Sequence, residues 1–429
     1  MAGRMMKDSG VEWIGTIPNE WKVKRNKELF TEVNERCEKG DDYTLLSVSE
    51  YSGVTPRTDV IKDGEFETHA ESLDGYKICR AGNIVMNIML AWKRATAVSR
   101  YDGIVSPAYC VYKGNRDVDT RYFHYLFRTD ICADMFKQYS TGIIDSRLRL
   151  YPDKFLTLYS AVPPLQEQAR IADFLDKKVS EIDAVISKTK ESIEEYKKLK
   201  QSIITEAVTK GLDPNVEMKD SGIEWIGSIP SSWEIQKFKN LGKCRNGLTY
   251  SPEDQCGEEG TLVLRSSNIQ EGKLSFDDCV YVNKEIPDDL YVKPGDILIC
   301  SRNGSAKLIG KNAIIPEGLC ASFGAFMMIY RSKCPEYLRY ILSSSIFSYY
   351  LGTFLTVSVN QLTGGNFNNI QFPYTDNPEE QKNIVDYLDK QSSKYDNLIS
   401  KKEKVITELE QYKKSLIYEY VTGKKEVLS

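Results

Sequence analysis

The sequence predicts a mixed α/β (α+β) protein with an internal pseudo-twofold repeat, in which an antiparallel pair of long coiled-coil helices separates two globular domains. Its 429 residues exceed the usual size of a single core. The chain repeats itself at an offset of about 212 residues, and two long segments carry a heptad pattern. With 41% hydrophobic and 28% charged residues, the composition is that of a globular protein.

The repeat lies at the ends of each unit. Residues Met6–Trp21 recur as Met218–Trp233 with twelve of sixteen positions identical, and motifs between Glu167 and Thr209 recur 213 residues later. Residues 22–161 and 234–376 show no register of similarity. A shared frame that carries two different inserts suits two modules that do the same job on different targets. The predicted segments are 6–21, 22–161, 162–215, 216–233, 234–376 and 377–429.

The repeated distal segments are predicted to be helices with apolar seams. Unbroken 4-3 spacing predicts two helices of about 45 residues, or roughly 65–70 Å, which begin at Pro164 and Pro378. The first is expected to end at Gly211. Lys200 and Lys413 fall on the seam, which predicts looser pairing there or burial against a partner. The principal seam positions are Leu175, Ile182, Ile186, Ile193, Ile203, Leu388, Ile399, Ile406, Leu409 and Leu416.

Such a pair could act as a ruler between the domains or as a dimerisation stalk, and periodicity alone leaves both open. Each insert is expected to combine short strands with one helix, at Tyr122–Tyr139 and Tyr337–Phe354. The expected strands are Ile84–Ile88, Thr96–Ser99, Ala108–Tyr112, Thr261–Arg265, Asp296–Cys300 and Ala325–Tyr330.

Catalytic motifs are missing from the sequence. It has two histidines, His69 and His124, and no cysteine or histidine cluster at metal-ligand spacing. The stretch Gly304–Asn312 fails the phosphate-loop pattern, and Asn377-Pro-Glu fails the adenine-methylation motif. We expect no catalytic residues, no metal and no bound cofactor.

Two parts of the sequence bear on membrane targeting: the amino-terminal segment and an uncharged stretch near residue 350. No apolar run follows the first basic residue, so a secretory signal is not expected, and we expect reduced thiols in a cytoplasmic protein. The uncharged stretch from Tyr340 to Thr375 is rich in Ser and Thr, which predicts a packed helix and a polar loop rather than a membrane span.

Binding features are better represented. The net charge is −4, but Tyr76–Arg149 holds twelve Lys/Arg against six Asp, and Arg302–Arg339 six against two Glu. Loops after buried strands carry side chains that can meet base edges and phosphates. The alternative is a merely solvated loop. The candidates for DNA contact are Trp92, Lys93, Arg94, Arg147, Arg149, Arg265, Asn268, Arg302, Asn303, Ser305, Lys307 and Lys311.

Together these segments resemble the specificity subunits of type I restriction-modification systems over residues 6–429. The repeated Asp-Ser-Gly-(Val/Ile)-Glu-Trp-Ile-Gly segment is similar to the family's proximal conserved segment. Pro163–Gln168 with Ile171–Asp176 is similar to the start of its spacer helix. Tyr101–Tyr109 and Pro294–Leu298 resemble strands of its target-recognition domains.

The resemblance implies a subunit without catalytic residues. Each target-recognition domain would read one half of a bipartite target in double-stranded DNA, and the helices would fix the gap between the halves. The helices would also dock two methyltransferase subunits, which bring S-adenosylmethionine and flip an adenine. Motor-nuclease subunits, which use ATP and Mg²⁺, would join for cleavage.

Three other functions stay open at this point. The chain could be the recognition subunit of a related system whose modification and cleavage activities are fused in one partner. It could instead be a coiled-coil scaffold with two protein-binding domains. An unrecognised enzyme is the third alternative. The start of the second helix, Asn377-Pro-Glu-Glu-Gln381, departs from Pro163-Pro-Leu-Gln-Glu-Gln168, so its first turn or its partner contact is expected to differ.

Overall fold

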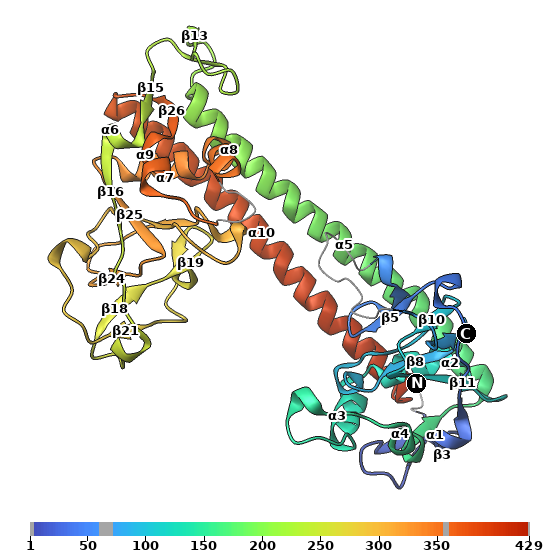
Figure 1. Ribbon diagram of the computed structural model, residues 1–429. Coiled ribbons are helices and arrows are strands. Elements are labelled where there is room, and N and C mark those ends of the chain that lie inside the picture. The colour runs from blue at the N-terminus through green and yellow to red at the C-terminus, as the bar shows by residue number, and fades with distance from the viewer. Residues whose placement is uncertain (1–3, 60–71, 355–359, 428–429) are drawn as a thin grey trace. The chain divides into compact units, whose positions relative to one another are not determined.

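The computed structural model describes residues 4–59, 72–354 and 360–427 (Figure 1). The chain divides into two compact units: unit 1 is residues 1–189 with 404–429, and unit 2 is residues 190–403. Each unit therefore combines one insert with part of both long helices. These helices are α5 (Leu165–Lys210) and α10 (Pro378–Val421).

Unit 1 is built on a four-stranded antiparallel sheet in the order β4-β11-β8-β9. Strand β8 is buried throughout because Ile84, Val85 and Met86 face protein on both sides. The strands of the unit are β1 (Met6–Asp8), β2 (Thr16–Pro18), β3 (Lys22–Arg25), β4 (Phe30–Glu32), β5 (Leu46–Ser49), β6 (Gly53–Pro56), β7 (Lys77–Cys79), β8 (Ile84–Asn87), β9 (Thr96–Val98), β10 (Gly103–Val105), β11 (Tyr109–Gly114) and β12 (Tyr159–Val162). Its short helices are α1 (Asn26–Leu29), α2 (Thr120–Phe127), α3 (Asp130–Gln138) and α4 (Pro152–Thr157).

Unit 2 repeats this plan with the sheet β16-β25-β22-β23 and adds a second sheet, β17-β21-β18-β24. Its strands are β13 (Met218–Asp220), β14 (Ser228–Pro230), β15 (Glu234–Lys237), β16 (Gly242–Asn246), β17 (Gln255–Cys256), β18 (Thr261–Leu264), β19 (Ile269–Gln270), β20 (Lys273–Leu274), β21 (Tyr281–Val282), β22 (Ile297–Cys300), β23 (Asn312–Ile314), β24 (Ser322–Phe323), β25 (Met327–Ser332) and β26 (Gln371–Tyr374). Its short helices are α6 (Phe238–Leu241), α7 (Pro335–Leu342), α8 (Ser345–Phe354) and α9 (Gly364–Asn369).

The inserts thus share one order of elements although their sequences show no register of similarity. Strand β8 corresponds to β22, β11 to β25, and α2–α3 to α7–α8. All six predicted strands are present, with ends within two residues of the predicted ones. Both inserts alternate hydrophobic and polar residues along their strands, and this pattern specifies a sheet without requiring identical residues. It accounts for the shared order of elements and for the correct prediction of the strands.

The prediction of one helix over Tyr122–Tyr139 is wrong, since α2 ends at Phe127 and α3 begins at Asp130. Thr129 lies between them: its hydroxyl donates to the Leu126 carbonyl at 2.7 Å and accepts from the Cys132 N–H. Threonine caps a helix start well, so the chain bends there. Ser344, whose hydroxyl donates to the Ile341 carbonyl at 2.6 Å, marks the same break between α7 and α8.

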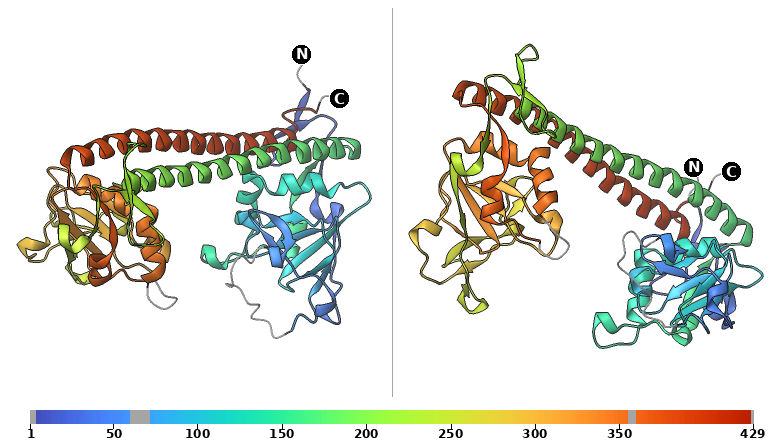
Figure 2. Two further views of the ribbon diagram at one scale, coloured as in Figure 1. Left: turned by 90° about the horizontal axis from the view of Figure 1, so that it is seen from above. Right: turned by 45° about the horizontal axis from the view of Figure 1, so that its top comes forward.

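Within each unit α5 and α10 run side by side and antiparallel (Figure 2). In unit 1 the rings of Phe174 and Tyr420 lie 4.5 Å apart, and further along α5 Lys413 donates to Asp183 at 2.6 Å. In unit 2 Lys200 donates to Asp396 at 2.6 Å. The opposite helix therefore supplies each seam lysine with a counterion. Looser pairing or burial against a partner at these positions stays a prediction.

Seam side chains line the contact between the two helices. In unit 1 Leu175, Ile182, Ile186 and Leu416 are buried, and Ile406 and Leu409 pack against the same core. In unit 2 Ile193, Leu388 and Ile399 are buried, and Ile203 packs against the core of that unit.

Corresponding contacts join each globular part to its helix. The carboxylate of Asp176 accepts from Tyr125 Oη at 2.7 Å, and that of Asp389 accepts from Tyr340 Oη. These aspartates belong to the repeated Leu-Asp-Lys motif. The indole N–H of Trp21 donates to Glu167 at 3.1 Å, and that of Trp233 to Glu380 at 2.9 Å. The repeated Trp, Glu and Asp residues therefore hold the frame of each unit together.

The starts and ends of the long helices follow local chemistry. Asn377 Oδ1 accepts the Glu379 N–H at 3.0 Å and caps α10, which is how its start differs from that of α5. Gly211 ends α5 with a φ of 74°, a conformation that favours glycine.

No described helix has the length and apolarity needed to cross a bilayer. Of the uncharged stretch between Tyr340 and Thr375, residues 355–359 lie outside the described part of the chain.

Candidate nucleic-acid interface

In unit 1 the loop that follows β8 carries three of the residues predicted to contact DNA. Trp92 is half-buried in a short 3-10 helix, and its indole N–H donates to the Met89 carbonyl at 3.1 Å. Exposed Lys93 lies 5.1 Å from the ring centroid. Arg94 has a φ of 66° and pairs with Asp130. The loop thus presents a cation beside an aromatic ring, and Arg94 is held by an aspartate.

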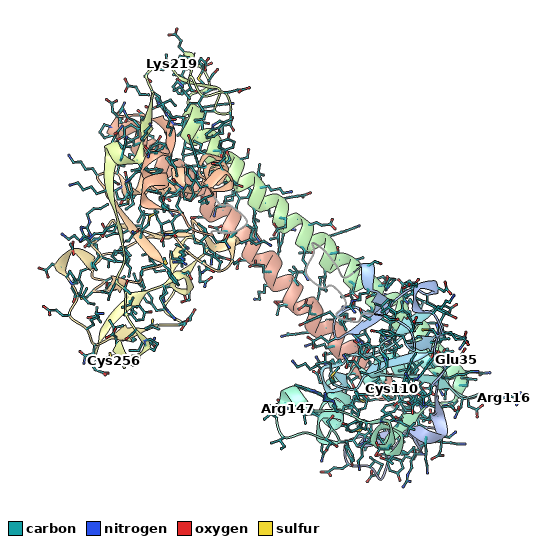
Figure 3. The ribbon with its side chains drawn as sticks, viewed as in Figure 1. Glu35, Cys110, Arg116, Arg147, Lys219 and Cys256 are labelled. Carbon is teal, nitrogen blue, oxygen red and sulfur yellow. The ribbon has the colours of Figure 1, made fainter. Side chains whose placement is uncertain are left out.

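The other two candidates of unit 1 lie on a neighbouring loop. Arg147 is exposed at one edge of the unit (Figure 3), and Arg149 is half-exposed where its backbone pairs with Thr141. The Leu150 N–H donates to the Ile88 carbonyl at 2.9 Å, so this loop is joined to the loop after β8. Two segments more than 50 residues apart in sequence therefore form one cationic surface.

In unit 2 the loop after β22 occupies the corresponding place. Arg302 is exposed, with its guanidinium 5.2 Å from the ring centroid of Phe326, which is itself 58% exposed. Ser305 and Lys307 are exposed on the same loop. The Leu362 N–H donates to the Ser301 carbonyl at 2.8 Å, as Leu150 donates to Ile88 in unit 1. Both units thus build the surface in the same way from different side chains.

The remaining candidates of unit 2 also serve the fold. Asn268 is fully buried, its amide donates to the carbonyls of Ser275 and Asp278 at 3.0 Å each, and its oxygen accepts the Arg265 N–H. We therefore assign Asn268 to holding the loop rather than to base contact. Arg265 pairs with Asp278 at 2.8 Å.

Two further candidates make weaker internal bonds. The amide of Asn303 donates to Ser266 at 3.1 Å, and Lys311 Nζ donates to the Ile269 carbonyl at 3.2 Å. These bonds join the loop after β18 to the loop after β22. The predicted residues of unit 2 therefore lie together, but only Arg302, Ser305 and Lys307 are exposed.

Several residues of these surfaces escaped the sequence analysis. Lys137 Nζ lies 5.0 Å from the Trp92 ring centroid, and Phe326 supports Arg302. Neither has a local signal, because each joins its partner only through the fold. Arg128 donates to the carbonyls of Arg94 at 2.9 Å and Glu50 at 2.7 Å, and so fixes the loop after β8 against the β5–β6 turn. Burial, and secondarily Arg94, lowers the pKa of Arg128 to about 10, which keeps the guanidinium charged at neutral pH.

Beside Arg128 lies a cavity of about 1100 Å³ within unit 1. It is lined by charged groups of both signs, among them Arg100, Asp183, Glu410 and Lys413. His124 also lines it, and its Nδ1 accepts the Val98 N–H at 3.3 Å. Burial, followed by the charges of Arg128 and Arg100, lowers the pKa of His124 to about 3, so the imidazole is neutral at physiological pH.

The structure offers no cluster of His, Cys, Asp and Glu that could hold a metal ion within residues 4–59, 72–354 and 360–427. All ten cysteines fall inside these ranges and carry free thiols. Burial raises the pKa of Cys79 to about 11 and that of Cys132 to about 12, which makes these thiols poor nucleophiles.

Known proteins share this organisation. Residues 230–411 match a family model described as the type I restriction modification DNA specificity domain. The chain is 25% identical to the type I restriction enzyme MjaVIII specificity subunit of Methanocaldococcus jannaschii, covering 96% of this chain and 94% of that relative. It is 28% identical to the EcoKI specificity subunit of Escherichia coli K12, over 46% of this chain and 44% of that relative.

A solved structure has the same fold. A chain from work on the complex assembly and conformational transition of the type I R-M system superposes with a TM-score of 0.69 at 17% sequence identity. The match covers 95% of this chain and 99% of that one. The domain model, the full-length relative and the repeated frame agree, and over its whole length the chain is similar to type I restriction-modification specificity subunits.

Proposed function

We propose that this chain is the DNA sequence-recognition subunit of a type I restriction-modification complex, and that each unit reads one half of a bipartite target. One observation carries the proposal. The two units share a fold, yet the corresponding loops after β8 and β22 present different side chains, Trp92 with Lys93 in one and Phe326 with Arg302 in the other. One scaffold with two unlike reading surfaces suits an asymmetric target.

The partners are proposed to be two copies of one methyltransferase subunit. Exposed side chains are not constrained by packing, so identity between repeats at exposed positions points to a shared partner. In unit 1 α5 exposes Lys177, Ser180 and Lys188, and α10 exposes Glu408 and Ser415. In unit 2 the same residue types stand exposed at the equivalent positions: Lys390, Ser393, Lys401, Glu195 and Ser202.

The chemistry is proposed to come from those partners. The methyltransferase subunits would bring S-adenosylmethionine, and motor-nuclease subunits would bring ATP and Mg²⁺. Partner cations would neutralise much of the phosphate charge, which is compatible with the net charge of −4 on this chain. We further propose that the paired helices, which contribute residues to both units, set the unread gap between the half-sites.

Selection from a random duplex pool tests the proposal. The complex purified with its methyltransferase should enrich a motif with two defined parts separated by a gap of fixed length. Trp92→Ala with Lys93→Ala should degrade one part only, and Arg302→Ala the other. A motif with one part, or both parts affected by either variant, would contradict reading by separate units. No enrichment at moderate salt would favour a protein-binding scaffold.

A further inference from the structure

The loop Ser140–Arg149 of unit 1 exposes an apolar tip. Ile143 is 100% exposed and Ile144 53% exposed, at a turn where Gly, Asn, Asp or Ser would be the stable choices. Single exposed apolar residues are common in proteins. This tip is different because Tyr139 and Tyr151, which flank the loop, and Leu90, on the loop after β8, are exposed as well.

The loop is held rigid. Thr141 and Arg149 exchange backbone hydrogen bonds of 2.9 and 3.0 Å across its base. The Arg147 N–H donates to the Ile144 carbonyl at 2.8 Å, and Lys137 pairs with Asp145 at 2.8 Å. At Gly142 a Cβ would approach the Arg147 carbonyl oxygen to 2.6 Å, so this turn requires glycine. These contacts hold Ile143 and Ile144 at the tip of an ordered loop.

Charge around the tip favours a polyanion. The Leu150–Ile88 bond and the Lys137–Trp92 contact hold residues 88–94 and 137–154 together. These segments contain six cations against Asp145 and Asp153, and Asp130 pairs with Arg94 from outside them. The cations are Lys93, Arg94, Lys137, Arg147, Arg149 and Lys154. The whole chain is acidic, so this positive balance is local.

We propose that Ile143 and Ile144 form a wedge that enters duplex DNA between stacked base pairs when unit 1 reads its half-site. Apolar side chains between flanking cations unstack a base step in this way, and the energy required depends on the sequence of that step. The wedge would make unit 1 select a deformable step without hydrogen bonds to its bases. The inference rests on the proposed function and adds a mode of readout to it.

The test uses the complex of this chain with its methyltransferase and the motif that the duplex selection yields. Ile143→Ala with Ile144→Ala should weaken binding to the intact duplex about tenfold, a loss comparable with that caused by one wrong base pair in a recognition site. Ile143→Leu, which keeps the apolar volume, should bind like the wild type. Tyr43→Ala, at a 42% exposed position outside the loop, is the matched control.

A series of duplexes, each with one mismatched base pair at a different position of the half-site, tests whether the isoleucines unstack a base step. A mismatch lowers the energy of unstacking, so at one step it should restore most of the affinity that the alanine variant loses. Unchanged binding by the alanine variant, or equal loss on intact and all mismatched duplexes, would overturn the wedge. Loss of the methyltransferase from the variant complex would also overturn it and would assign the tip to protein contact. If the wild-type complex enriches no motif, the proposed function fails and the wedge with it.

Discussion

Packing against an aromatic ring orients the side chain of Arg302, a residue that we propose to contact DNA. Its guanidinium lies against the exposed ring of Phe326, which limits the rotamers of a long side chain. We expect Arg302→Ala to weaken binding of the selected duplex by roughly 1–3 kcal/mol and to relax specificity at one base pair. Titration against duplexes substituted at each motif position measures both effects.

Lys307→Ala is the matched control for Arg302 because Lys307 is exposed on the same loop without an aromatic partner among the described contacts. It should weaken binding equally on all sequences, as a phosphate contact does. If Arg302→Ala also weakened binding equally on all sequences, Arg302 would be a phosphate contact and not a base contact.

We expect His124 to make unit 1 less stable in acid. Its pKa is about 3 in the folded protein and about 6.5 when unfolded, so below pH 6.5 the unfolded state binds the additional proton. Stability should therefore fall as the pH falls from 7 to 5, by up to about 2 kcal/mol from this group. Denaturant unfolding of the whole chain at pH 7 and pH 5 measures this change in the free energy of unfolding.

His124→Asn, which can still accept the Val98 N–H, supplies the control. This variant should lose that part of the pH dependence which His124 contributes. An identical difference between pH 7 and pH 5 in the variant and the wild type would show that other groups cause the acid sensitivity.

The residue scale also shows where sequence reasoning ends. Arg302, Ser305 and Lys307 were predicted as surface candidates, and they are exposed. Asn268 has the same local pattern but is buried, because a polar residue after a strand can bond to its own loop as readily as to a base. Phe326 and Lys137 could not be predicted, since each lies far in sequence from the residue it supports.

At the scale of elements, heptad spacing predicted the helices well because it reports packing directly. The predicted length of about 45 residues compares with 46 and 44 in the structure. The breaks at Thr129 and Ser344 were missed, because capping hydroxyls do not disturb apolar periodicity. The sequence did not reveal that the two inserts share a topology, because corresponding strands share the alternation of hydrophobic and polar residues but not the residues themselves.

The seam lysines give the helix pair its register. Lys200 faces Asp396, and Lys413 faces Asp183, so a shift by one heptad would separate both pairs. We expect Lys200→Glu to destabilise unit 2 by about 1 kcal/mol, because it places two carboxylates together. The double variant Lys200→Glu with Asp396→Lys should restore the melting temperature. If the double variant did not recover the melting temperature, the ion pair between residues 200 and 396 would contribute no stability of its own.

At the scale of the whole molecule, duplication explains why one chain can serve an asymmetric target. The repeated residues are those that hold the frame, such as Trp21 with Glu167 and Trp233 with Glu380, or those that face outward on the helices. The proposed DNA-contact loops neither hold the frame nor face a shared partner, so their sequences are free to differ between the two units. A change of target in one half then leaves the frame and the partner surfaces intact.

The proposed ruler predicts how the gap responds to helix length. One heptad inserted after Thr189 and another after Glu403 keep both seams in phase and lengthen each helix by roughly 10.5 Å. The gap in the selected motif should grow by about three base pairs, at 3.4 Å per pair, while both half-sites stay the same. Four residues inserted at the same places put the seams out of phase, and this control should destabilise the pair. An unchanged gap in the stable heptad variant would show that something other than helix length sets the distance.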